Sequence, residues 1–179
     1  MRNTIVCIVG PSGSGKTLMS KYLWTQYSIP YIVSCTTRPM REGEKDGVDH
    51  FFVSSEVIRK AERDNNILAY TKFGGYEYCA LKETPYQHRA CTYVIDEDGV
   101  RYLMEHCQDE FELLVVYVDA TEETRWFQRC IPQARIDRDK ERVPLERKVY
   151  SDVIHNDGTK REFFKQIDKF VESFKFWLK

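Results

Sequence analysis

The sequence has no long apolar run, no excess of charge of one sign and no cysteine pair at metal-binding spacing. No apolar segment approaches the ~20 residues that a membrane-spanning helix needs, so we expect no membrane insertion. The 27 basic and 28 acidic residues give a net charge of −1, which argues against the global positive field of a protein that coats nucleic acid. Any binding of anions must therefore come from local clusters of basic residues.

The cysteine pattern also excludes a class of site. No C-x-x-C pair and no H-x-x-x-H motif is present, which argues against a structural zinc site. Several cysteines lie inside apolar runs, where a thiol behaves as a small buried side chain. This usage predicts a reduced, cytoplasmic protein. The six are Cys7, Cys35, Cys79, Cys91, Cys107 and Cys130.

Segments of strand and helix character alternate along the 179 residues, which predicts one α/β domain with a sizeable core. Residues 67–73 and 76–80 flank Gly74-Gly75 and predict a hairpin. The remaining strands are expected at 4–9, 31–34, 50–53, 92–95, 111–118 and 152–155. Helices are expected at 16–27, 54–65, 99–107, 122–150 with an interruption near Pro132, and 159–178; residues 36–50 are expected to form a loop.

The last predicted helix carries an apolar stripe at alternating spacings of four and three residues. Such a stripe would allow membrane or partner binding, but it is typical of any helix that packs against a sheet, and we expect core packing. The stripe consists of Phe163, Ile167, Phe170, Phe174 and Trp177.

Residues 10–17 read GPSGSGKT, the pattern G-x-x-x-x-G-K-[ST], between a predicted strand and a predicted helix. Its glycines allow the backbone N–H groups to face a phosphate, and the helix adds the positive end of its dipole. Lys16 is expected to reach the β- and γ-phosphates of ATP, and Thr17 to bind Mg²⁺. A glycine-rich turn that binds nothing is the alternative, and the strand–loop–helix context argues against it. The predicted ATP-binding residues here are Gly10, Ser12, Gly13, Ser14, Gly15, Lys16 and Thr17.

A phosphate-binding loop does not by itself name the acceptor. Arg38 and Arg41 lie three residues apart in the predicted loop, where two guanidinium groups can grip one phosphate. The spacing alone fits a solvated charged loop better, because Glu42, Glu44 and several other charged residues are close by.

Residues 34–53 resemble the guanylate kinase signature S-x-T-T-R-x-x-R-x-G-E-x-x-G-x-D-Y-x-F-V. Further motifs resemble the family in order: the phosphate-binding loop, F-x-G-x-x-Y at 73–78, a strand that ends in Asp96 and Asp98, and V-I-x-N-D at 153–157. The resemblance covers essentially the whole chain. The signature matches at Ser34, Thr36, Thr37, Arg38, Arg41, Gly43, Glu44, Gly47, Asp49, Phe52 and Val53.

The resemblance implies a kinase that transfers the γ-phosphate of ATP, with Mg²⁺, to GMP or dGMP. It implies a P-loop core of parallel sheet and helices (1–33, 81–124 and 143–179), a small β-rich lobe for the nucleoside monophosphate (34–80) and a helical lid (125–142). All three would belong to a single domain, 1–179. Small-molecule nucleotides are the expected partners, and both a monomer and a homodimer remain open.

The family's residue roles carry over by position. Ser34 would contact the acceptor base, and Asp98 would lie near the guanine. Asp96 would lie by the phosphates and share Mg²⁺ with Thr17, partly through water, and Asn156 would lie beside the ATP base. Arg38, Arg41, His50 and Tyr78 would hold the acceptor phosphate, and the catalytic residues would be Lys16, Arg38, Arg129 and Arg135.

The sequence departs from the family pattern where the family reads guanine. The usual glutamate before the hairpin is Ala69, and the hydroxyl residue after it is Ala80. Glu77 is a candidate substitute for that glutamate. If Gly99 aligns with the family's glycine, Asp96 becomes the second aspartate of the pair and Val94 replaces the first.

The lid and the acceptor phosphate site also depart from the pattern. The family's R-G-x-G lid tip is replaced by residues 130–133, and His50 replaces a tyrosine. The six arginines between 125 and 147 fit a solvated helix as well as a lid.

Two alternatives follow from these departures. The first is a kinase for another acceptor, either a different nucleoside monophosphate or ribose 1,5-bisphosphate. The second is a guanylate-kinase-like binding module without catalysis, which the complete phosphate-binding loop argues against.

Overall fold

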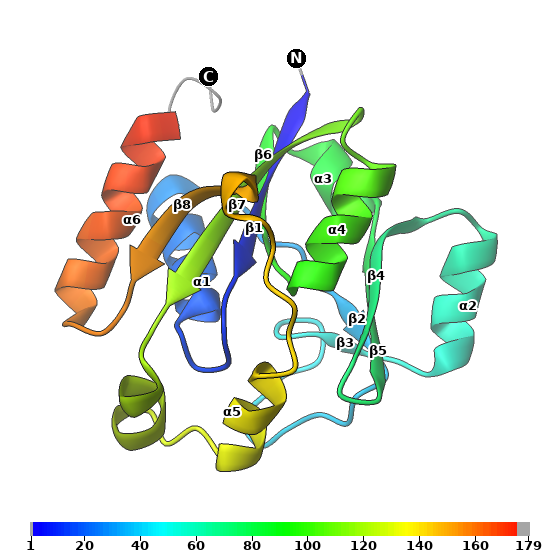
Figure 1. Ribbon diagram of the computed structural model, residues 1–179. Helices are drawn as coiled ribbons and strands as arrows, with labels where there is room; N and C mark the ends of the chain where they lie inside the picture. Colours follow the sequence, from blue (N-terminus) through cyan, green and yellow to red (C-terminus); the bar gives the residue numbers. More distant parts are fainter. Residues whose placement is uncertain (1, 175–179) are drawn as a thin grey trace.

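The computed structural model describes residues 2–174, which form two sheets with helices around and between them (Figure 1). The first sheet is parallel, with the strand order β6-β1-β7-β8. Its strands are β1 (Asn3–Val9), β6 (Ala90–Val94), β7 (Phe111–Asp119) and β8 (Tyr150–His155). The second sheet has the order β3-β2-β5-β4, from β2 (Cys35–Thr36), β3 (Phe51–Phe52), β4 (Ile67–Phe73) and β5 (Tyr76–Leu81).

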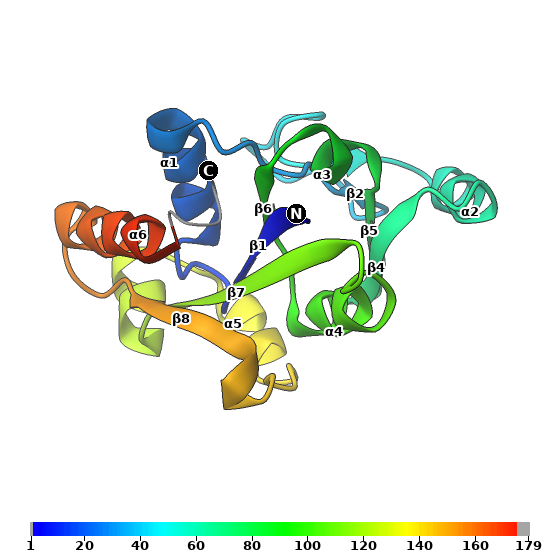
Figure 2. The same ribbon diagram turned by 90° about the horizontal axis from the view of Figure 1, so that it is seen from above.

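Strand β1 lies inside the parallel sheet and is buried on both faces, which explains why it is apolar along most of its length. Val6 and Ile8 belong to the core on the side of α1 (Lys16–Tyr27) and α6 (Lys160–Phe174). Ile5 and Cys7 belong to the core on the opposite side, towards α4 (Glu97–His106) and β4. Figure 2 shows α1 and α6 on one side of the sheet and α4 on the other.

The amphipathic stripe of α6 packs against the sheet, as the sequence predicts. Phe163, Ile167 and Phe170 are buried in the core shared with α1. The expected continuation to 178, with Trp177, lies outside the described residues.

The second sheet is tied to the first through α4, which contacts β4. On the outer side of this sheet, α2 (Ser55–Arg63) buries Ile58 against Cys35 and Cys79. A short helix that the sequence did not predict, α3 (Glu83–Gln87), connects β5 to β6. The six cysteines are free thiols, and all but Cys130 are buried.

Two sequence predictions are wrong in detail. Residues 31–34 do not form a strand; Tyr31 makes a single bridge to Thr92, and the strand comes later, at β2, where the predicted loop begins. The strand forms there because Thr36 pairs with Tyr78 of β5, a distant partner that local sequence does not reveal.

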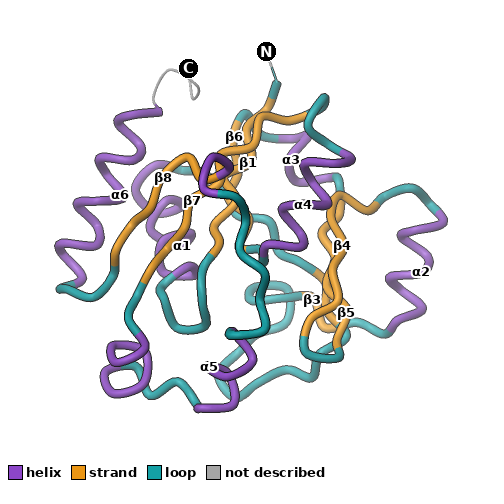
Figure 3. The backbone as a smooth tube through the Cα atoms, in the orientation of Figure 1, coloured by secondary structure: helices purple, strands orange, loops and turns teal. Residues whose placement is uncertain are grey.

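The predicted helix 122–150 is broken into a π-helical turn (Thr124–Gln128), α5 (Gln133–Asp139) and a 3-10 turn (Arg147–Val149). Figure 3 shows the irregular chain between α5 and β8. Pro132 caps α5, and Tyr150 pairs with Val115 in the sheet, so neither residue continues a helix. No helix within residues 2–174 is both long and apolar enough to cross a membrane.

The carboxyl ends of the parallel strands meet at one edge of the sheet, where open α/β sheets bind their ligands. The GPSGSGKT loop follows β1, Asp96 follows β6 and Asn156 follows β8. In Figure 1 this edge also faces α5, which places several predicted site residues around one region.

We expect Ile167→Ala to destabilise the protein, because Ile167 is 0% exposed and its removal leaves a cavity against α1 and the sheet. The loss should be on the order of 2–5 kcal/mol in the free energy of unfolding, measured by urea denaturation. Lys165→Ala, at an exposed position of the same helix, is the control and should cost less than about 0.5 kcal/mol. Equal effects of the two variants would contradict the docking of α6.

Candidate active site

The GPSGSGKT loop has the backbone geometry of a phosphate cradle. Gly10, Gly13 and Gly15 have φ values of 144°, 77° and 112°, which side chains disfavour. The ammonium of Lys16 donates hydrogen bonds to the carbonyls of Gly10 and Pro11, both at 2.7 Å. Burial, and then the nearby Arg142, lower the pKa of Lys16 to about 7.

Two predicted site residues, Asn156 and Arg129, donate hydrogen bonds to carbonyl groups of the loop. The amide of Asn156 is buried and donates to the carbonyl of Ser14 at 2.7 Å. Arg129 donates to the carbonyl of Gly13 at 2.6 Å and also to that of Asn156. Arg129, expected over the transferring phosphate, therefore lies against loop carbonyls, and the Asn156 side chain lies behind the loop.

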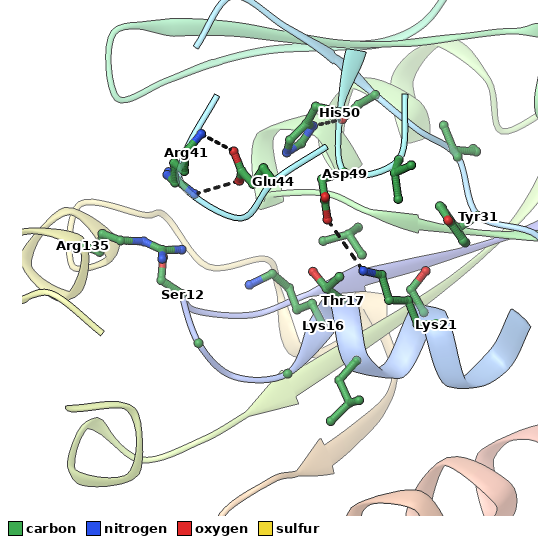
Figure 4. A pocket seen from close by; sticks show the side chains of 18 residues that line it. Ser12, Lys16, Thr17, Lys21, Tyr31, Arg41, Glu44, Asp49, His50 and Arg135 are labelled. Carbon is green, nitrogen blue, oxygen red and sulfur yellow. Dashed lines mark hydrogen bonds and ion pairs between the residues drawn. The ribbon is translucent and has the colours of Figure 1, made fainter. Parts of the chain in front are cut away.

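A cavity of about 390 Å³ opens between the loop and the segment that joins β2 to β3. In Figure 4, Ser12, Lys16 and Thr17 line one side of it. Arg41, Glu44 and His50 line the other side. The cavity is thus bounded by two segments that the sequence singled out independently.

A second cavity, of about 150 Å³, adjoins the first. The two share Ser12, Lys16, Ser34, Arg41, His50, Val94 and Arg135 as lining residues. Arg38, Tyr78, Asp96, Arg138, Asp139 and Arg142 are among those that line only the second. Its basic residues outnumber its acidic ones, which suits an anionic ligand.

Glu44 fixes the two arginines predicted to hold the acceptor phosphate. Its carboxylate accepts two hydrogen bonds from the Arg38 guanidinium, at 3.0 and 2.9 Å, and one from the backbone N–H of Arg41 at 2.7 Å. Burial opposes its ionisation, but these hydrogen bonds prevail and lower the pKa of Glu44. The Arg41 side chain is 40% exposed and 3.7 Å from Glu44, so it keeps donors for a ligand.

His50 lies among other predicted acceptor-site residues. Its Nδ1 is 2.9 Å from the hydroxyl of Ser34, and its ring meets that of Tyr78 edge-on. Burial, and then the positive charge of Arg38, lower the pKa of His50. This shift favours the neutral ring, which can donate or accept a hydrogen bond.

Thr71 and Tyr78 are the polar hairpin residues that line the second cavity, whereas Ala69 and Ala80 do not line it. Ala69 and Ala80 face each other across β4 and β5 and are buried in the apolar core. Glu77, the candidate substitute for the missing glutamate, accepts from Tyr70 at 2.6 Å and pairs with Arg59. It does not line the cavity, because its carboxylate is engaged by these two residues.

Of the two aspartates after β6, the structure brings one to the cavity. Asp96 caps α4 by accepting from the Gly99 N–H at 2.8 Å, and its other oxygen accepts from Thr71 at 3.3 Å. Burial raises the pKa of Asp96. Asp98 is exposed, pairs with Arg101 at 2.6 Å and lines a different cavity.

Helix α5 presents two arginines to the second cavity. Arg135, which the sequence predicted, and Arg138, which it did not, lie one turn apart. The Nε atoms of both are buried without a hydrogen-bond partner among residues 2–174. Arg138 also lies 4.6 Å above the ring of Phe73, so the hairpin orients it. The row of arginines between 125 and 147 was the only sequence signal for Arg138.

Within residues 2–174, no cluster of three or more His, Cys, Asp or Glu is placed to hold a metal ion. Mg²⁺ needs no such cluster, because it keeps waters and takes oxygens from phosphates. The Thr17 hydroxyl, which lines the first cavity beside Lys16, fits that role. Asp96 lines the second cavity with both its oxygens engaged, so contact through water suits it better.

Comparison with known proteins gives consistent matches. A family model described as guanylate kinase matches residues 1–172. The guanylate kinase of Mesoplasma florum is 28% identical over 179 residues, which cover 93% of this chain and 60% of that protein. That of Listeria monocytogenes serotype 4b is 39% identical over 79 residues, or 43% of this chain and 38% of the relative. The chain thus matches less than two thirds of the length of these relatives.

Among solved structures, the guanylate kinase from Anaplasma phagocytophilum superposes with a TM-score of 0.70 at 20% identity. The match covers 99% of this chain and 87% of that one. At this identity the likeness concerns the fold alone, and it confirms the predicted α/β architecture of a parallel sheet flanked by helices.

The lowered pKa of Lys16 predicts that polyphosphate binding takes up a proton. At pH 8, a Lys16 with a pKa of about 7 is mostly neutral. A bound polyphosphate favours the charged ammonium and raises this pKa, so the uptake should approach one proton. Calorimetric titration with inorganic triphosphate in two buffers of different protonation enthalpy measures it. The uptake should be small at pH 6 and should vanish in Lys16→Met; no buffer dependence at pH 8 would contradict the prediction.

Proposed function

The chain belongs to the guanylate kinase family, as its sequence motifs predicted, and from this premise we propose that it transfers the γ-phosphate of ATP to GMP or dGMP. The observation that carries the proposal is the junction of the two cavities at Ser12, Lys16 and Arg135. A donor whose phosphates lie on the GPSGSGKT loop and an acceptor phosphate held by Arg38 and Arg41 would meet at this junction.

Phosphoryl transfer depends mainly on positioning and on neutralising charge, and these residues supply both. Lys16 would neutralise the β- and γ-phosphates. Glu44 accepts a hydrogen bond from the backbone N–H of Arg41 and lies 3.7 Å from its guanidinium. The Arg41 side chain would therefore keep donors to bind the acceptor phosphate. The acceptor oxygen is already anionic at neutral pH, so the reaction needs no general base.

The remaining predicted roles fit around this centre. Thr17, and Asp96 through water, would hold Mg²⁺, which would supply positive charge to neutralise the donor phosphates. Arg135 and Arg138 would cover the transferring group from α5. We infer that residues 34–80 and 125–142 close over the core as acceptor lobe and lid, which would exclude water during transfer.

A second candidate function concerns the acceptor. Ala69 and Ala80 are part of the apolar core, and no glutamate takes the place of the missing one in the cavity. Guanine N–H groups would therefore rely on Asp96 and Ser34. This favours, as the alternative, a kinase for another nucleoside monophosphate or for ribose 1,5-bisphosphate.

A binding module without catalysis remains the third reading, and the complete phosphate cradle argues against it. Failure to bind ATP·Mg²⁺ in calorimetry would support this reading.

The acceptor can be identified by measuring ADP release from ATP·Mg²⁺ with GMP, dGMP, AMP, UMP, CMP, dTMP and ribose 1,5-bisphosphate, each tested separately. We expect GMP or dGMP to give the highest kcat/KM. The preference over other bases should be smaller than in an enzyme with a carboxylate at position 69, because fewer polar groups are left unpaired by the wrong base. A higher kcat/KM for another acceptor would replace GMP in the proposal.

Replacing Arg41 should weaken the acceptor site selectively. Arg41→Gln removes a charge-assisted contact to the acceptor phosphate and should raise the acceptor KM roughly 10- to 100-fold, with little change in the KM for ATP. The measurement is steady-state kinetics with each substrate varied in turn. Arg63→Gln, at an exposed position of α2, is the matched control. An unchanged acceptor KM in Arg41→Gln would contradict the assignment of this cavity.

A further inference from the structure

A carboxylate from α5 is hydrogen-bonded to the phosphate-binding loop. Asp139 accepts from the backbone N–H of Ser12 at 2.6 Å and from its hydroxyl at 3.0 Å. The same carboxylate is 3.2 Å from the guanidinium of Arg125, in the π-helical turn. Asp139 therefore joins three segments: the loop after β1, the turn after β7 and α5.

This cluster is almost fully removed from water. The side chains of Asp139 and Arg125 are 6% and 9% exposed. A buried carboxylate is tolerated only when its charge and lone pairs are satisfied, and here the loop and Arg125 do so. Because releasing Asp139 would leave Arg125 without its carboxylate partner, the contact holds the two helical parts of segment 125–142 together on the loop.

The position of Asp139 on α5 links this contact to the arginines of the second cavity. Arg138 and Asp139 follow Arg135 by three and four residues, so all three share a face of the helix. When Asp139 is bound to Ser12, this face is turned towards the junction of the two cavities, and Arg135 and Arg138 line the second one.

We propose that Asp139 is a positioning residue that docks α5 on the phosphate-binding loop and so places Arg135 and Arg138 for phosphoryl transfer. The proposal rests on the proposed kinase function. Arg125 contributes to the same positioning, because its hydrogen bond to Asp139 ties the π-helical turn to the docked helix. Docking through a buried charge-assisted contact fixes the arginines more tightly than a helix joined to the core by irregular chain alone.

The test compares Asp139→Ala and Asp139→Asn with the wild type and with Asp137→Asn. Asp137 lies on the same helix with its side chain 56% exposed, and its carboxylate accepts from the neighbouring Gln133 and Lys140, so it is a matched control. We expect Asp139→Ala to lower kcat about tenfold or more while changing the KM for ATP less than about threefold. Asp139→Asn keeps an acceptor for the Ser12 N–H and should recover part of kcat; Asp137→Asn should match the wild type.

Hydrogen exchange measured by mass spectrometry on the protein without added nucleotide provides a readout that does not depend on the acceptor. Amides of residues 133–139 should exchange faster in Asp139→Ala than in the wild type, while those of α6 should not change. If the wild type transfers phosphate to no acceptor, the proposed function fails, but the exchange experiment still decides whether Asp139 docks α5.

Three results would overturn the proposal. Unchanged exchange at 133–139 would show that Asp139 does not hold the helix. An unchanged kcat with faster exchange would show that docking does not place the arginines. A several-fold lower KM for ATP with an unchanged kcat would show that Asp139 competes with a donor phosphate for the Ser12 N–H.

Discussion

The crowding of positive charge at one edge of the parallel sheet is the constraint on which the rest of this site depends. Lys16 and Arg38, Arg41, Arg135, Arg138 and Arg142 line one small cavity. Burial, and then the repulsion between these cations, lowers the pKa of Lys16, Arg41 and Arg135. Such an arrangement is held together only if carboxylates fix some of the cations and a ligand can satisfy the others.

The chain divides these tasks between different acidic residues. Glu44 binds Arg38 bidentately, Glu97 pairs with Arg142, and Asp139 pairs with Arg125 beside the phosphate-binding loop. These three ion pairs form a rigid frame, which consists of Arg38, Arg142 and Arg125 with their carboxylate partners. Arg41, Arg135 and Arg138 are less engaged, and they lie where the two cavities meet or at the lid side of the second one. The frame thus leaves donors for phosphate oxygens at one place.

The sequence was informative where function depends on a contiguous segment. Residues 10–17 specify a loop whose glycines and following helix act locally, and the structure has the strand and helix on either side of it. Contacts between distant segments were harder to predict from the sequence. Strand β2 pairs with β5, and Glu77 accepts a hydrogen bond from Tyr70 and forms an ion pair with Arg59. Arg138 and Asp139 gave no motif, because their contacts, Phe73 and Ser12, are more than 60 residues away in the chain.

In the proposed kinase, the residues for the phosphates and those for the acceptor base lie on separate parts of the fold. This separation would allow the first set to be complete while the second departs from the family pattern. The arginines and Lys16 act on charge, which every phosphorylated acceptor carries. In the proposed kinase, recognition of the base would depend on a few polar groups near the hairpin, where Ala69 and Ala80 belong to the apolar core. Burying these alanines leaves the hydrogen bonds of Glu44 and Asp139 untouched, because those bonds are made with Arg38 and Ser12. Base specificity in this chain can therefore change without any change in how the phosphate is held.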